Sequence, residues 1–283
     1  MTPAPGHDGR LTLLDAGHDD NDQPNTKSEP TRERSSFAGY QSPQHPTLGQ
    51  FARMTTAVIL QSNYMPWRGY FDLIRRADHF VFYDEVQYTK RDWRNRNRIV
   101  GPNGAQWLTI PVATGGKYDQ TIAETQVSDP NWARDHMMSV QRMLARGSRY
   151  AALAPKLRYW YHATANETSL SAINQLLIRN LMAELGLTTT LHRSETLGAP
   201  AGQTARLVEI CRALGVQRYL SGPAARSYLD EALFADAGIA VDWMDYPEYP
   251  SYTQSNGSYD PKVSIIDCLA WLSPADIFGA SVT

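Results

Sequence analysis

Strand-like and helix-like segments alternate along two parts of this chain, and that alternation restricts the possible fold strongly. Short β-branched and apolar runs predict strands, and apolar residues at helical spacing predict helices between them. The expected strands are 57–61, 79–84, 188–193, 218–222 and 239–246, and the expected helices between or after them are 70–76, 204–215, 227–238 and 263–272. Because strand–helix–strand units favour parallel pairing, we expect an α/β protein with a mostly parallel sheet and crossover helices.

The middle and the beginning of the chain have different patterns. The segments NRIV and WLTIPV flank a GPNG turn and predict a hairpin. Apolar residues at helical spacing follow over about 130–186, and we expect this insertion to form a helical cap over the sheet, within one domain of residues 54–283. Residues 1–53 are rich in Pro, Gly, Asp, Ser, Thr and Gln, which predicts a disordered tail.

Charge and composition narrow the possible partners. The chain carries 27 Lys and Arg against 29 Asp and Glu, so its summed field offers no general attraction to DNA. It has 2 cysteines, no Cys/His cluster with metal-ligand spacing, no leader-like start and no apolar run long enough to span a bilayer. We therefore expect a cytoplasmic protein without a membrane span or a bound structural metal. Walker A, G-x-G-x-x-G and HExxH patterns are also missing.

The loop QSNYMPWRGY follows the first expected strand and is a candidate binding site. In open parallel sheets, ligands bind beyond the carboxyl ends of the strands. Gln61 and Asn63 could donate hydrogen bonds, Tyr64 and Trp67 could stack on a base or sugar, and Gly69 would let an anion approach the backbone. The alternative is a packed loop whose aromatic residues cover the end of the sheet.

The segment DEVQYTKRDWRNRNRI is the most specific signal in the chain. Guanidinium groups suit bidentate recognition of phosphate or carboxylate, and only one acidic residue interrupts the basic run. If the segment continues as a strand, Arg94, Arg96 and Arg98 share one face. The candidate ligand-binding residues here are Tyr88, Arg91, Trp93, Arg94, Asn95, Arg96 and Arg98. We favour a small phosphorylated or nucleotide-linked substrate over a polyanion such as RNA.

Polar residues at the ends of other strands add to the candidate site. Asp84 ends the second strand beside the arginines, where a carboxylate could accept a proton, bind a metal or form an ion pair. Ser221 and Gly222, in RYLSGPAARSYLDE, could hold a phosphate or carboxylate, although Ser221 could equally cap a helix. Asp245 follows the next strand and could join the same pocket.

Long strings of the chain resemble the WbqC-like family over about residues 57–271. They are LQSNYMPWRGYFDLI, FYDEVQYTKRDWRNRNRI, WLTIPV, LVEICRALG and YLSGPAARSYLDE, whereas TQSNGSYD and WLSP depart from the family pattern. The resemblance implies an enzyme of surface-polysaccharide (O-antigen) or other biosynthetic clusters, with glycyl transfer onto a sugar as the suggested chemistry. The first strand and loop also look like a nucleotidylyltransferase-like Rossmannoid fold, but Trp67 and Tyr70 stand where that group has histidines.

These features together predict a biosynthetic transferase. We expect it to join an aminoacyl, glycyl-type group to an amine of a sugar or specialised metabolite. Arg91, Arg94, Arg96 and Arg98 would neutralise a phosphate-activated donor, and Asp84 would deprotonate the amine. ATP or another nucleotide, and Mg²⁺, are compatible with this chemistry. The alternatives are nucleotidyl transfer in the same pocket and non-catalytic binding of a nucleotide sugar or RNA.

Overall fold

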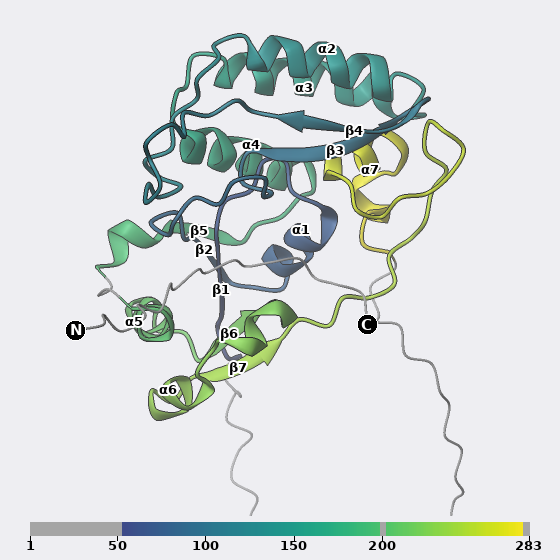
Figure 1. Ribbon diagram of the computed structural model, residues 1–283. Coiled ribbons are helices and arrows are strands. Elements are labelled where there is room, and N and C mark those ends of the chain that lie inside the picture. The colour runs from purple at the N-terminus through teal and green to yellow at the C-terminus, as the bar shows by residue number, and fades with distance from the viewer. Residues whose placement is uncertain (1–52, 199–201, 280–283) are drawn as a thin grey trace, which may run out of the picture.

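A parallel sheet of five strands forms the centre of the protein (Figure 1). The computed structural model describes residues 53–198 and 202–279, so the tail expected at 1–53 lies almost wholly outside the described residues. The sheet order is β5-β2-β1-β6-β7, and every neighbouring pair is parallel. The strands are β1 (Thr56–Leu60), β2 (His79–Phe82), β5 (Thr190–Arg193), β6 (Arg218–Ser221) and β7 (Ala240–Trp243). This confirms the expected α/β class.

The order of the strands creates a crevice between β1 and β6. Helix α1 (Arg68–Arg75) links β1 to β2 on one side of the sheet, and α6 (Glu231–Asp236) links β6 to β7 in the opposite direction. Helix α5 (Thr204–Leu214) joins β5 to β6, and Figure 1 shows α1 and α5 on opposite sides of β1. Because the chain leaves β1 and β6 in opposite directions, the carboxyl ends of these two strands flank the usual ligand position of such a sheet.

A second layer covers one end of the sheet (Figure 1). It contains the antiparallel hairpin of β3 (Arg96–Gly101) and β4 (Gly104–Thr109), as predicted from the GPNG turn. Helices α2 (Trp132–Leu144) and α3 (Tyr150–Thr164) pack together, and α2 packs on the hairpin so closely that a Cβ at Gly101 would lie 2.3 Å from the Met143 sulfur. Helix α2 thus packs on the hairpin. The predicted helical cap directly over the parallel sheet is not confirmed.

The remaining helices tie the two layers together. Helix α4 (Leu170–Glu184) follows α3, and α7 (Ile265–Trp271) packs near β3 and α3. Asp267 of α7 is fully buried and accepts hydrogen bonds from the Val100 backbone (2.6 Å) and the Tyr252 hydroxyl (2.8 Å). Three short 3₁₀ helices complete the described chain: η1 (Ser194–Leu197), η2 (Pro223–Ser227) and η3 (Pro274–Asp276). Across the described residues, we find no helix with the length and apolar character that a bilayer crossing needs.

Candidate functional site

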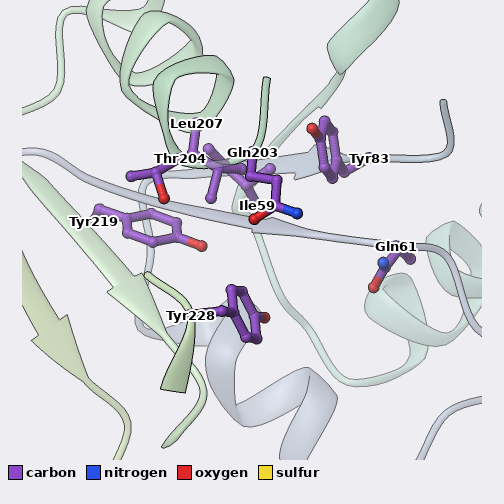
Figure 2. Close-up of a pocket in the computed structure, with 8 residues that line it drawn as sticks. All are labelled: Ile59, Gln61, Tyr83, Gln203, Thr204, Leu207, Tyr219 and Tyr228. Atoms are coloured by element: carbon purple, nitrogen blue, oxygen red, sulfur yellow. The ribbon is translucent and has the colours of Figure 1, made fainter. Parts of the chain in front are cut away.

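A small pocket lies at the crevice between β1 and β6 (Figure 2). Its enclosed space is about 20 Å³, room for one or two water-sized groups, and the pocket opens to solvent. The lining combines apolar side chains with amide and hydroxyl groups from β6, the start of α5 and the residues that follow β1, β2 and η2. The residues are Ile59, Gln61, Tyr83, Gln203, Thr204, Leu207, Tyr219 and Tyr228. Of the residues predicted from the sequence, Gln61 is the one that lines this pocket.

A buried arginine stands directly behind Gln61. The Arg94 residue is only 3% exposed, and its Nη2 donates to Gln61 Oε1 at 3.0 Å. Its Nη1 donates to Asn63 Oδ1, and the Asp92 carboxylate lies 3.6 Å from Nη2. The structure therefore brings Gln61, Asn63 and Arg94 together at the carboxyl end of β1, as the sequence predicted. Arg94 is held rigidly, because three oxygen-bearing side chains surround one guanidinium group.

Arg94 also acts on a tyrosine of the pocket. Burial raises the pKa of the Tyr228 hydroxyl to about 12, and the positive charge of Arg94 opposes this rise. The hydroxyl is therefore protonated at neutral pH and available as a hydrogen-bond donor. Gln61 and Tyr228 thus both line the pocket, and Arg94 behind the lining contacts the first and acts electrostatically on the second.

The other arginines of the basic segment do not converge with Arg94. Arg91 is exposed, with a left-handed φ of 62°, and its carbonyl accepts a hydrogen bond from Arg96. Arg96 lies 4.1 Å from the Trp107 ring centre, and Arg98 forms an ion pair with Asp260 at 3.1 Å. The expected shared face holds only for Arg96 and Arg98, because residue 94 precedes β3 and turns toward the parallel sheet.

The uncharged residues of the basic segment fasten the hairpin to the first loop. Asn97 is buried and donates to the Met65 carbonyl at 2.8 Å, and Asn95 donates to the Ile110 carbonyl at 2.8 Å. The Trp93 carbonyl accepts the Tyr64 N–H at 3.0 Å, while its ring packs 5.5 Å from that of Trp107. Their contacts are with protein groups, so a packing role explains both asparagines. Tyr88 is buried as well.

Tyr64 belongs to a buried network with helices α2 and α3. Its hydroxyl lies 2.8 Å from His136 Nδ1 and 2.7 Å from the Tyr161 hydroxyl. His136 Nε2 lies 3.1 Å from the Thr109 carbonyl, which can only accept, so Nε2 carries the proton and Nδ1 accepts from Tyr64. The Tyr64 side chain is fully buried. Its hydrogen bonds anchor the loop after β1 to α2 and α3, and its buried ring is not available to stack on a ligand in this conformation.

The His136 contacts predict a pH-dependent stability. Burial lowers the pKa of His136 from 6.5 to about 4 in the folded protein. As the pH falls, the unfolded chain therefore binds a proton at His136 before the folded protein does. The contribution of neutral His136 to the free energy of unfolding is fully present above about pH 6.5 and is lost progressively as the pH falls toward 4. Between pH 7.5 and 5 we expect a loss of about 2 kcal/mol in the free energy of unfolding from this residue. Urea denaturation at both values measures it, and a His136→Gln variant with an equally steep loss would contradict the assignment.

The Trp67 ring packs against Gly69 and covers its backbone. A Cβ at Gly69 would lie 2.3 Å from Trp67 Cη2, so the indole occupies the space where an anion was expected to approach. The Trp67 ring also packs on Tyr246 at 5.1 Å, and a Cβ at Gly222 would lie 3.7 Å from the Tyr246 hydroxyl. Trp67 and Tyr246 thus pack together beside Gly222, and none of these three residues lines the pocket.

The remaining predicted residues are also outside the pocket lining. Ser221 is 2% exposed, and its carbonyl accepts the Met244 N–H at 2.7 Å, whereas Asp245 is exposed. Asp84 is 3% exposed and accepts hydrogen bonds from the Ser62 N–H (2.7 Å), the Ser171 hydroxyl and Gln175 Nε2 (3.2 Å). These three donors give Asp84 a positioning role beneath the loop, where it connects the end of β1 to α4.

Most of the pocket was not predicted from the sequence. Tyr83 directly follows β2 and Gln203 precedes α5, so their positions at strand and helix ends could have indicated them. Tyr219 and Tyr228 gave no such signal, since tyrosines in strands and turns are common core residues. Among residues 53–198 and 202–279, no group of three or more His, Cys, Asp or Glu side chains is placed to hold a metal ion.

These observations define an α/β protein with a Rossmann-like parallel sheet and a small pocket at its strand-order reversal. A family model described as the WbqC-like protein family matches residues 61–278, and the chain belongs to this family. It is 42% identical to "Uncharacterized protein Rv1507c" of Mycobacterium tuberculosis (strain ATCC 25618 / H37Rv) over 216 residues, which are 76% of this chain and 93% of the relative. No solved structure matches the chain significantly.

Proposed function

We propose that this WbqC-like protein is a biosynthetic transferase that forms an amide bond. It would transfer an aminoacyl, glycyl-type group from a phosphate-activated donor to an amine of a sugar or specialised metabolite. The observation that carries this proposal is the buried Arg94, held beside the pocket by Gln61 and Asn63. A fixed positive group near a pocket is suited to stabilise negative charge that develops during acyl transfer.

The proposed reaction needs charge stabilisation more than a chain nucleophile. The neutral amine nitrogen attacks the acyl carbon, a C–N bond forms, the C–O bond to phosphate breaks with its electron pair leaving on phosphate, and the amine proton passes to the released phosphate or to water. Arg94 would stabilise the negative charge that develops on the acyl carbonyl oxygen, while Asp92 and the two amides keep its guanidinium in place. Asp84 would act through Ser62, which neighbours Gln61 and Asn63.

The exposed hairpin supports a second candidate function. Trp107 is 42% exposed, Arg96 stacks on its ring, and Trp93 packs beside it. Aromatic rings next to arginines are typical of surfaces that bind single-stranded nucleic acid or nucleotides. This favours a non-catalytic binding protein for RNA or a nucleotide sugar as the alternative.

The proposal is tested by incubating the purified protein with ATP, glycine and a panel of amino sugars. We expect ATP consumption and an amide product, both followed by mass spectrometry. Pyrophosphate release without an amide product would indicate nucleotidyl transfer instead. Binding of RNA with a steep salt dependence, together with no turnover of any donor, would favour the binding protein and contradict the transferase.

A further inference from the structure

We infer that the pocket between β1 and β6 binds a small monocarboxylate, and that a polyphosphate group does not enter it. The pocket is the one lined by Gln61, Tyr83, Gln203 and Tyr228 (Figure 2). In terms of the proposed function, on which this assignment of a substrate end rests, the carboxylate is the acyl end of the substrate before its activation. The phosphate of an activated donor then lies outside the pocket.

The orientation of the Gln61 amide places a hydrogen-bond donor in the pocket. An arginine side chain can only donate hydrogen bonds, so the atom of Gln61 that Arg94 Nη2 contacts at 3.0 Å must be the amide oxygen. The amide NH₂ of Gln61 therefore points away from Arg94. Gln61 is 3% exposed and lines the pocket, and its NH₂ donates to no protein group in the described part of the chain. This amide donor faces the pocket without a protein partner, so it is free to donate to an acceptor on a ligand.

Two further donors surround the same space. The Tyr228 hydroxyl is buried and has no hydrogen-bond partner among residues 53–198 and 202–279. Helix α5 begins at Thr204 in the pocket wall, and the side chain of its first flanking residue, Gln203, does not cap it. The first backbone N–H groups of a helix lack partners within the helix and carry its positive dipole end. The Gln61 amide, the Tyr228 hydroxyl and the start of α5 can therefore all donate hydrogen bonds to the acceptor oxygens of a ligand.

The charges around the pocket limit the ligand to about one negative charge. Arg94 lies 3.6 Å from Asp92, and Arg206, whose guanidinium lies 5.2 Å from the Tyr83 ring, forms an ion pair with Glu85. Asp84 is buried nearby and adds a further carboxylate. The two cations are thus already balanced, so a di- or triphosphate would meet uncompensated repulsion, whereas a monocarboxylate would meet neutral donors.

The enclosed space of the pocket limits the ligand to a small group. At about 20 Å³ it has room for one or two water-sized groups, such as the oxygens of a carboxylate, and no room for a nucleotide sugar. The apolar part of the lining, from Ile59 and Leu207, would contact the carbon atoms of the acid.

Titration calorimetry without turnover tests the inference. The probes are acetate, glycine and N-acetylglycine on one side, and inorganic phosphate, AMP and ATP on the other. We expect at least one carboxylate to bind the wild type and to compete with none of the phosphates. Gln61→Glu keeps an oxygen for Arg94 but replaces the NH₂ by a negatively charged oxygen, so the carboxylate Kd should rise at least tenfold. Tyr228→Phe should raise it about threefold to tenfold without loss of stability, because the hydroxyl has no protein partner to lose.

The controls separate this inference from the proposed reaction. Tyr246→Phe changes a tyrosine outside the pocket and should leave carboxylate binding unchanged, and thermal unfolding verifies that each variant is folded. No carboxylate binding to the wild type at up to about 10 mM, or equal binding to Gln61→Glu, would overturn the inference. Phosphate binding that depends on Gln61 would overturn it too. Carboxylate binding with the expected losses, but without an amide product in any assay, would leave the pocket assignment standing and remove the transferase.

Discussion

Replacing Arg94 by Gln is expected to lower the rate of the proposed transfer reaction at least 100-fold. Arg94 is the fixed cation next to the pocket, and removal of a single preorganised donor to a developing oxyanion typically costs about 10² to 10³ in kcat. The Gln side chain can still donate to Gln61 or Asn63, so the loop should keep its conformation. Product formation under saturating substrate, measured by mass spectrometry, gives the size of the loss.

Two variants complete this experiment. Arg91→Gln removes an exposed arginine of the same segment and should retain nearly full activity, whereas Arg94→Lys keeps the charge but loses the fork that contacts two amides. We expect Arg94→Lys to recover only part of the activity. A folded Arg94→Gln protein with wild-type turnover would show that Arg94 has only a structural role. An equal loss of activity in Arg91→Gln would show that the whole basic segment, and not Arg94 in particular, contributes to the reaction.

Replacing Asp84 by Ala should lower the free energy of unfolding by about 3–5 kcal/mol, because a buried charged group with several hydrogen bonds is removed. The Ser62 N–H, the Ser171 hydroxyl and Gln175 Nε2 would then lose their acceptor in a site that is 3% exposed. Urea denaturation at neutral pH measures the loss. Since Ser62 lies between Gln61 and Asn63, carboxylate binding should weaken along with the stability.

The Asp84→Asn variant distinguishes positioning from proton transfer. An amide keeps the shape of the carboxylate but turns an NH₂ toward groups that donate, so we expect stability and binding to fall together. A catalytic base would give another result, in which Asp84→Asn stays as stable as the wild type and loses only turnover. That outcome would contradict the positioning role.

The parallel sheet could be predicted from the sequence because buried parallel strands carry a local signal. Residues 57–60 are apolar without interruption and form β1, and the helix before Gly215 ends in the left-handed conformation that glycine favours. The hairpin followed from its turn in the same way. Each of these elements depends on residues close together in the chain.

The site was harder to predict because its contacts join distant residues. Arg94 and Gln61 are 33 positions apart, and nothing near residue 94 indicates that it leaves the face of Arg96 and Arg98. The expected access at Gly69 is not available since Trp67, two residues earlier, folds over it. Composition singled out the basic segment as a candidate site, but neighbouring aromatic rings and Asp260 decide where Arg96 and Arg98 lie. Only three-dimensional packing contains that information.

The most direct test of the central claim is a crystal structure with the carboxylate or acyl substrate bound. We expect electron density between the Gln61 amide, the Tyr228 hydroxyl and the start of α5, with a carboxylate oxygen within hydrogen-bond distance of Gln61 Nε2. Density that lies instead over Trp107 and Arg96 on the hairpin, with the pocket between β1 and β6 unchanged, would contradict it.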